Sequence, residues 1–207
     1  MIIFDIGCCF GIWTDAHYKV KDTFLLIEAN YDMFTKVREK YKDKNNITVL
    51  HLLASNENFE MLDFYVAENS VGEVSTASKK YIEICRHKDH WKEPVKILSI
   101  TLDALILGFG DPDLIKIDVE GYENKVLAGL SKKTKGRIIF EYMEEMRDET
   151  IECVKHLNSI GYNEFYWQYG DEARFVPPGY TTIEKTIEYL DTLKPKRKQV
   201  WGMIHAQ

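Results

Sequence analysis

Short apolar runs alternate with helix-like stretches through the first two thirds of the chain, and this alternation constrains the fold more than any other feature. The runs cover residues 2–4, 23–27, 47–53, 114–119 and 137–140. Continuous apolar runs of this length are typical of strands buried on both faces of a parallel sheet, and the stretches between them are long enough for connecting helices. The pattern predicts an α/β fold in which a mostly parallel, Rossmann-like sheet carries helices on both faces.

The last third of the chain extends the same pattern. Residues 147–160 are helical in pattern, and Gly161 stands where a C-terminal cap belongs. Strand-like residues 163–169 and 199–206 flank a helix near 184–193. Because so short a piece joins these two strands, we expect them to pair at one edge of the sheet, with the last strand antiparallel.

One segment departs from the alternation. Residues 59–66 predict an extra strand, and residues 68–95 are polar with little periodicity. Long polar segments inside compact domains are usually functional. We therefore expect residues 68–95 to form an insertion or lid on the substrate side of a single domain that spans residues 1–207.

Charge and composition exclude several classes of partner. The formal net charge is −6, with 29% charged and 45% apolar residues. No apolar run approaches the roughly 20 residues that span a bilayer. These features predict a soluble domain that binds neither nucleic acid nor membrane. The four cysteines lack paired or C-x-x-C spacing, which favours free thiols in a reducing, cytoplasmic environment. A catalytic Cys8 or Cys9 is the alternative to simple packing.

Carboxylates stand where most of the runs end: Asp5, Glu28, Asp118 with Glu120, and Glu141. In doubly wound sheets, ligands bind beyond the carboxyl ends of the strands where the strand order reverses, so these side chains are expected to line one crevice. The turn from Asp5 through Gly7 to Gly11 lacks the phosphate-loop lysine and the dinucleotide glycine spacing. An acid-headed glycine turn followed by Glu28 suits an ammonium group and a ribose diol, as in S-adenosylmethionine.

The motifs at these positions resemble those of the FkbM-type methyltransferases. The likeness runs from about residue 2 to residue 142, and its most specific part is Lys-Ile-Asp-Val-Glu-Gly-Tyr-Glu at residues 116–123. It implies a class I fold and an S-adenosylmethionine-dependent O-methyltransferase, with S-adenosylhomocysteine as product. This chain departs from the family at Cys8-Cys9, where Ala-Asn is usual.

The resemblance also implies roles for individual residues. The first turn, with Asp5, Gly7, Cys8 and Gly11, would hold the methionine part of the cofactor. The ribose would lie at Glu28 and Ala29, the adenine at Ala54 and Ser55, and the reacting centre at Asp118 and Glu120.

The transfer of a methyl group to an alcohol needs a base for the hydroxyl proton. Asp118 or Glu120 is our candidate, and Lys116, two residues before Asp118, is expected to be its ion-pair partner. Asp118 and Glu141 are also candidates to hold Mg²⁺ or Mn²⁺, because oxygen ligands suit these ions.

The acceptor is expected to be a sugar hydroxyl of a glycan, contacted by His87, Trp91 and Trp167, although the two tryptophans are equally well explained as packing residues. A non-sugar small molecule such as a macrolide is the alternative acceptor. A nicotinamide-dinucleotide oxidoreductase is the alternative enzyme class. A nucleic-acid methyltransferase fits the negative charge poorly, and a non-catalytic binding module would not need the carboxylates at Asp118, Glu120 and Glu141.

Overall fold

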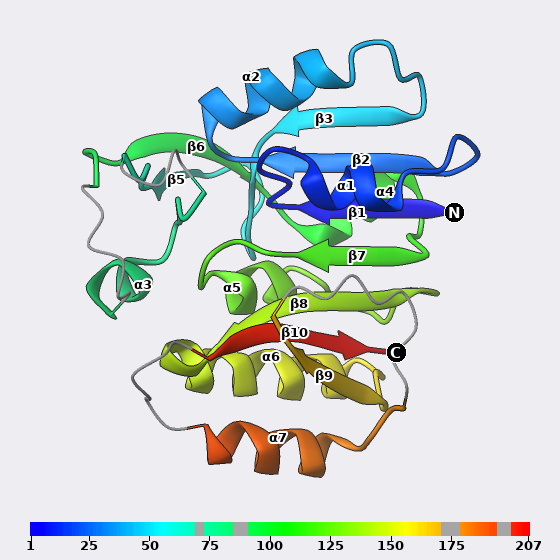
Figure 1. The fold of residues 1–207 in the computed structure, drawn as a ribbon, viewed down its shortest axis with the longest axis vertical. Coiled ribbons are helices and arrows are strands. Elements are labelled where there is room, and N and C mark those ends of the chain that lie inside the picture. Colours follow the sequence, from blue (N-terminus) through cyan, green and yellow to red (C-terminus); the bar gives the residue numbers. More distant parts are fainter. Residues whose placement is uncertain (69–72, 85–90, 171–178, 194–199) are drawn as a thin grey trace.

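The computed structural model describes residues 1–68, 73–84, 91–170, 179–193 and 200–207. The arrangement of the elements is shown in Figure 1.

A seven-stranded sheet forms the centre of the molecule, with strand order β3-β2-β1-β7-β8-β10-β9. From one edge to the other the strands are β3 (Ile47–His51), β2 (Thr23–Glu28), β1 (Ile2–Ile6), β7 (Leu114–Ile117), β8 (Arg137–Met143), β10 (Trp201–Ala206) and β9 (Phe165–Tyr169). The first five are parallel, whereas β10 runs antiparallel to both β8 and β9. This confirms the predicted mostly parallel sheet and its antiparallel last strand.

Helices cover both faces of this sheet, as predicted. On one face, α1 (Ile12–His17) and α2 (Tyr31–Lys40) lie over Phe24 and Leu26, with Val37 of α2 in the same cluster. The other face carries α4 (Leu102–Phe109), α5 (Glu123–Ala128), α6 (Arg147–Ser159) and α7 (Ile183–Thr192). A 3₁₀ turn, η1 (Glu144–Met146), leads from β8 into α6. None of the described helices combines the length and the apolar character that crossing a membrane requires.

A small second sheet lies beyond the carboxyl ends of the parallel strands, where Figure 1 also shows α3 (Lys79–Ile84). Its strands are β4 (Leu53–Ala54), β6 (Val95–Ile100) and β5 (Met61–Phe64), in that order. The extra strand expected at residues 59–66 is thus confirmed as β5.

The apolar run 47–53, predicted as one strand, is divided between the two sheets. Its first part pairs with β2 as far as the partners Glu28 and His51. Beyond that point β2 ends, so the backbone at Leu53 and Ala54 pairs with β6 instead. The prediction of a single strand was wrong because an apolar run does not show where the neighbouring strand stops.

The described part of the polar segment 68–95 is folded and partly buried. Ser75 and Thr76 are buried, and so is Tyr81 of α3. The Thr76 hydroxyl donates a hydrogen bond to the Glu120 carbonyl oxygen at 2.7 Å, and the Ser75 hydroxyl accepts one from the Ala67 N–H at 3.1 Å. The polar side chains of this segment therefore satisfy buried backbone groups and fasten the segment to the loop after β7.

Candidate active site

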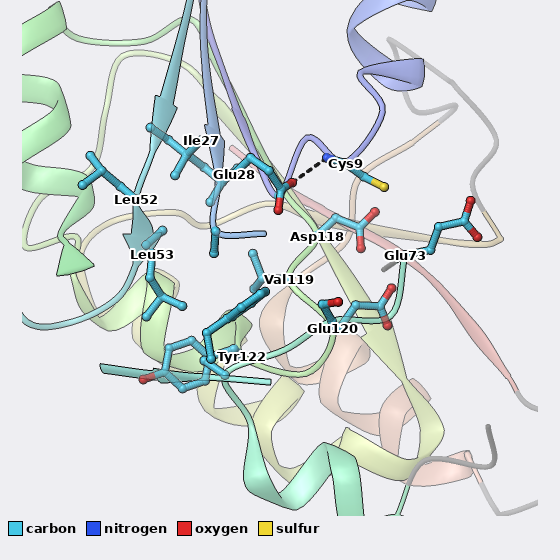
Figure 2. Close-up of a pocket in the computed structure, with 17 residues that line it drawn as sticks. Cys9, Ile27, Glu28, Leu52, Leu53, Glu73, Asp118, Val119, Glu120 and Tyr122 are labelled. Carbon is cyan, nitrogen blue, oxygen red and sulfur yellow. Dashed lines mark hydrogen bonds between the residues drawn. The ribbon is translucent and has the colours of Figure 1, made fainter. Parts of the chain in front are cut away.

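The strand order reverses between β1 and β7, and a cavity with an empty volume of about 530 Å³ lies beyond the carboxyl ends of these strands. Figure 2 shows that its two ends differ: Leu53, Val119 and Tyr122 lie at an apolar end, while Asp118 and Glu120 lie at an acidic end. We call this space the cofactor cavity.

The turn after β1 brings the backbone close to the loop after β7. Gly7 has φ +74°, and a Cβ at this position would collide with the carbonyl oxygen of Asp118. Only glycine fits here, for both reasons. Gly11, with φ +69°, precedes the first residue of α1, and its carbonyl oxygen accepts a hydrogen bond from the Tyr41 hydroxyl. Gly7 lines the cofactor cavity, whereas Gly11 shapes the turn without lining it.

Glu28 is held rigidly at the end of β2. Its side chain accepts a hydrogen bond from the Cys9 N–H, drawn in Figure 2, and another from the Asn30 N–H; both are 2.8 Å long. Burial raises the pKa of Glu28 to about 7. Each carboxylate oxygen keeps a second lone pair, so Glu28 can accept hydrogen bonds from a diol while its own position is fixed by the backbone.

Asp5 does not line the cofactor cavity, which corrects the expectation that it binds the cofactor's ammonium group. Its side chain is fully buried, where it accepts a hydrogen bond from the Thr14 hydroxyl at 2.6 Å and lies 3.6 Å from Lys116 Nζ. The reason is the alternation of side chains along a strand: Asp5 is still inside β1, and its side chain points toward the face that α1 covers.

Lys116 links Asp5 to the reacting centre. Its Nζ lies 3.1 Å from Asp118 Oδ2 and donates to the Gly7 carbonyl oxygen at 3.3 Å. Burial disfavours the ammonium form, but Asp118 and Asp5 outweigh burial and raise the pKa of Lys116 above its ordinary value. The predicted ion pair between Lys116 and Asp118 is present.

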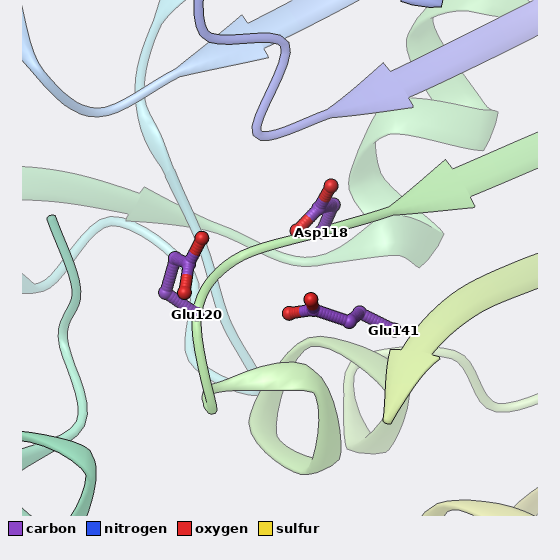
Figure 3. A group of neighbouring side chains, drawn as sticks. All are labelled: Asp118, Glu120 and Glu141. Atoms are coloured by element: carbon purple, nitrogen blue, oxygen red, sulfur yellow. The ribbon is translucent and has the colours of Figure 1, made fainter. Parts of the chain in front are cut away.

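Asp118, Glu120 and Glu141 form a cluster in which one oxygen from each lies within 4.8 Å of the others. Figure 3 shows Glu141 projecting from β8 toward the two acids of the loop after β7. Glu120 has φ +56°, an uncommon conformation for a residue other than glycine. Its carboxylate accepts a hydrogen bond from the Tyr81 hydroxyl at 2.7 Å. The loop is therefore held in a strained conformation that aims Glu120 at its neighbours.

Burial and mutual repulsion favour protonation of this cluster. Burial, followed by the charge of Asp118, raises the pKa of Glu120 to about 8. The same two causes raise the pKa of Glu141 well above its ordinary value. Glu141 Oε2 is buried and has no hydrogen-bond partner among the described residues. Carboxylates arranged in this way can take up a proton or share a hard cation.

Of the two residues expected at the adenine, Ala54 lines the cofactor cavity, as does Ala29, which was expected beside the ribose. Ser55 does not line it: it is fully buried, with its hydroxyl 3.5 Å from the Tyr122 hydroxyl. Phe64 and Tyr122 complete the apolar end. The sequence analysis assigned neither to the site. Tyr122 could have been found, because it follows Glu120-Gly121 in the loop after a predicted strand.

A second, more open hollow with an empty volume of about 970 Å³ adjoins the cofactor cavity. Gly7, Cys9, Asp118, Glu120 and Glu73 line both spaces. Cys8 lines only the second, which we call the acceptor hollow.

The thiols beside these spaces are unsuited to nucleophilic catalysis. Burial raises the pKa of Cys9 to about 12 and that of Cys8 well above its ordinary value, and the carboxylate of Glu28 adds to both shifts. A thiol needs a lowered pKa to act as a thiolate near neutrality, so packing is the better interpretation.

Trp91 and Trp167, which we expected at the acceptor, line neither space. Trp91 packs against a cluster of Tyr81, Met143 and Met146. Trp167 stacks on Tyr189 of α7 with ring centroids 4.4 Å apart. Both are packing residues, because their strands and loops direct them toward hydrophobic neighbours. His87, the third expected contact, lies outside the described residues.

Comparison with known proteins identifies the family. The sequence pattern of the Methyltransferase FkbM domain matches residues 5–169, which include every strand end of the site. The chain belongs to the FkbM methyltransferase family. The predicted family is thereby confirmed, and the protein is an S-adenosylmethionine-dependent methyltransferase, not a nicotinamide-dependent oxidoreductase. No curated protein matches the chain.

Several solved structures are similar to this FkbM-family chain at low identity. One is a precorrin-6y C5,15-methyltransferase from Geobacter metallireducens GS-15, with 12% identity and a TM-score of 0.48 over 100% of this chain and 78% of that chain. Another is an S-adenosylmethionine-dependent O-methyltransferase from Thermotoga maritima, with 11% identity and a TM-score of 0.45 over 100% of this chain and 58% of that chain. At such low values these likenesses carry no argument about the substrate.

Proposed function

We propose that this FkbM methyltransferase transfers the methyl group of S-adenosylmethionine to a hydroxyl oxygen, on a sugar of a glycan, with Glu120 as the general base. The observation that carries the proposal is the position of Glu120. It lies where the cofactor cavity meets the acceptor hollow, and its raised pKa, about 8, suits a base that works near neutral pH.

The two ends of the cofactor cavity match the two ends of this cofactor. Ala54, Phe64 and Tyr122 offer an apolar slot for adenine. Glu28 lies between the ends and can accept hydrogen bonds from the ribose diol. The carboxylates at the acidic end attract the sulfonium and the ammonium groups, which are both positively charged.

The chemistry is an in-line displacement at the methyl carbon. The acceptor oxygen forms a bond to that carbon while the carbon–sulfur bond breaks, and the electron pair stays on sulfur, which becomes the neutral thioether of S-adenosylhomocysteine. The hydroxyl proton passes to the Glu120 carboxylate. Correct alignment of oxygen, carbon and sulfur supplies about 7–11 kcal/mol in favourable cases.

A divalent cation is the second part of the proposal. Asp118 and Glu141 would hold Mg²⁺ or Mn²⁺, which fits the oxygen-only donor set and the unpartnered, buried Glu141 Oε2. When bound, such an ion would acidify and orient the acceptor hydroxyl. Treatment with EDTA followed by Mn²⁺ tests this part: we expect activity to fall and then recover, and activity that is indifferent to EDTA would exclude it.

A sugar is favoured over a macrolide-like acceptor by the mixed character of the acceptor hollow. Apolar Ile12 and Trp13 line it together with the carboxylates of Asp118 and Glu120. A sugar ring presents apolar C–H groups and hydroxyl donors together, whereas a largely apolar ring would leave the carboxylates without partners.

The role of Glu120 is tested by the substitution Glu120→Gln, which keeps the shape of the side chain and removes its basicity. We expect methyl transfer from labelled S-adenosylmethionine to fall by about 10²–10⁴-fold, the usual contribution of a placed base. Binding of S-adenosylhomocysteine should persist. Asp118→Ala provides the comparison: if that variant alone abolishes turnover and Glu120→Gln does not, Asp118 is the base.

A further inference from the structure

The helix α1 buries polar side chains and exposes an apolar one, the reverse of the usual arrangement. Its buried residues are polar, Thr14 at 0% exposed and His17 at 7%, whereas the apolar Ile12 is 69% exposed. Thr14 is drawn inward by its hydrogen bond to Asp5. Trp13 is partly buried against the core, but the core does not bury Ile12 and so does not explain an apolar residue at this position.

These apolar residues face the acceptor hollow. Phe10, Ile12 and Trp13 line it together with Ala16. The indole of Trp13 is fixed by stacking on the His17 ring, with centroids 4.1 Å apart. The result is a preformed apolar wall beside the reacting carboxylates.

The acceptor hollow also has an acidic part. Glu73, Asp118 and Glu120 line it, and the lysine among the described lining residues, Lys116, is already paired with Asp5 and Asp118. An anionic group placed here would be repelled without finding an unpaired cation in this part of the hollow. A neutral molecule with hydroxyl groups would instead donate hydrogen bonds to these carboxylates.

We propose that the acceptor binds on this wall, with the apolar face of an uncharged sugar ring against Phe10, Ile12 and Trp13 and its hydroxyl groups toward Asp118 and Glu120. This inference rests on the proposed function and adds to it the place and the charge of the acceptor. It makes α1 a determinant of acceptor affinity.

The test uses Ile12→Gln, because Ile12 is exposed and its replacement should not disturb folding. Leu107→Gln is the matched control: Leu107 is 90% exposed on α4 and lines neither space. The probes are methyl glycosides of common hexoses and 6-deoxyhexoses, and the 6-phosphates of the hexoses. Each is assayed with labelled S-adenosylmethionine, and S-adenosylhomocysteine binding is measured by calorimetry for all three proteins.

We expect Ile12→Gln to raise the KM of the best neutral glycoside about tenfold, the equivalent of about 1.4 kcal/mol, with kcat and S-adenosylhomocysteine affinity unchanged. Leu107→Gln should match the wild type, and each 6-phosphate should be a poorer acceptor than its neutral counterpart.

Each other outcome has a definite meaning. An unchanged KM in Ile12→Gln, or equal use of the 6-phosphates, would overturn the inference and leave the proposed function in place. No methylation of any glycoside, with S-adenosylhomocysteine still bound, would overturn the acceptor class in both. No binding of S-adenosylhomocysteine by the wild type would overturn the proposed function itself, and the inference with it.

Discussion

The cofactor cavity and the acceptor hollow share several residues but are built in different ways. The first lies at strand ends, where backbone N–H groups fix Glu28 and where Gly7 permits close approach of the chain. The second is open and owes one wall to a short helix, α1, whose Ile12 is exposed although its Thr14 and His17 are buried. The sheet therefore holds the residues of the cofactor cavity in place, whereas one wall of the acceptor hollow depends on the side chains of α1.

Lys116 lines the acceptor hollow and contacts Asp118, which lines both spaces, and removal of Lys116 should have the largest effect. Lys116→Met leaves Asp5 buried without a cation, and loss of one partner of a buried ion pair typically costs about 3–5 kcal/mol. We expect urea unfolding to show a loss of this size. The double variant Asp5→Asn/Lys116→Met should recover part of it. A single variant as stable as the wild type would show that the two spaces are not joined through this ion pair.

The substitution Glu28→Gln should distinguish the roles of the two spaces, because Glu28 lines the cofactor cavity and not the acceptor hollow. The amide cannot accept from the backbone and from a ribose diol as a carboxylate does, and hydrogen bonds to a charged group contribute about 1.5–3 kcal/mol each. We expect S-adenosylhomocysteine affinity to fall about 100-fold by calorimetry. Glu60→Gln, at an exposed glutamate, is the control. Equal affinity in both variants would remove Glu28 from the cofactor site.

The buried glutamates Glu120 and Glu28 should make the free energy of unfolding depend on pH. The pKa of Glu120 is about 8 and that of Glu28 about 7, both above the ordinary value of 4.5. The folded chain thus holds more protons than the unfolded chain between about pH 6.5 and 8.5, and its free energy of unfolding should fall across this window by on the order of 1 kcal/mol or more. The pKa of the buried His205 is lowered to about 4, so this residue affects the free energy of unfolding only below about pH 6.5, its ordinary pKa.

Urea unfolding at pH 6.5 and pH 8.5 checks this prediction. Glu120→Gln should reduce the difference between the two pH values, because the amide does not titrate. A wild type that is more stable at pH 8.5 would mean that the cluster is ionised in the folded protein.

The smallest effect is expected at Cys9, which lines both spaces. Cys9 has φ +46°, a conformation that asparagine tolerates better than cysteine. Cys9→Asn should raise the free energy of unfolding by up to about 1 kcal/mol without loss of S-adenosylhomocysteine binding. Cys9→Val, which is β-branched, should instead destabilise the fold. A stabilising valine would contradict the backbone argument.

The sheet and much of the cofactor cavity could be predicted from the sequence, because apolar runs and the residues that end them are local features. The residues Glu28, Ala54, Asp118 and Glu120, which we expected at the site from the sequence, line this cavity. Asp5 was misplaced because the sequence does not show that β1 continues past it to Ile6.

The rest of the site depends on contacts between distant segments. Tyr81 reaches Glu120 only because α3 folds over the loop after β7, and a polar side chain that satisfies a buried partner looks like a solvated one in the sequence. The wall of the acceptor hollow was missed for the converse reason. Residues of α1 resemble core residues in the sequence, and only the structure shows Ile12 exposed and Thr14 buried.

The most direct test of this account is calorimetric titration of the purified protein with S-adenosylhomocysteine, with NAD in a parallel experiment. We predict saturable binding of S-adenosylhomocysteine at one site, weakened about 100-fold in Glu28→Gln, and no binding of NAD. Binding of NAD alone would contradict the assignment of the cavity between β1 and β7 to a methyl-donor cofactor.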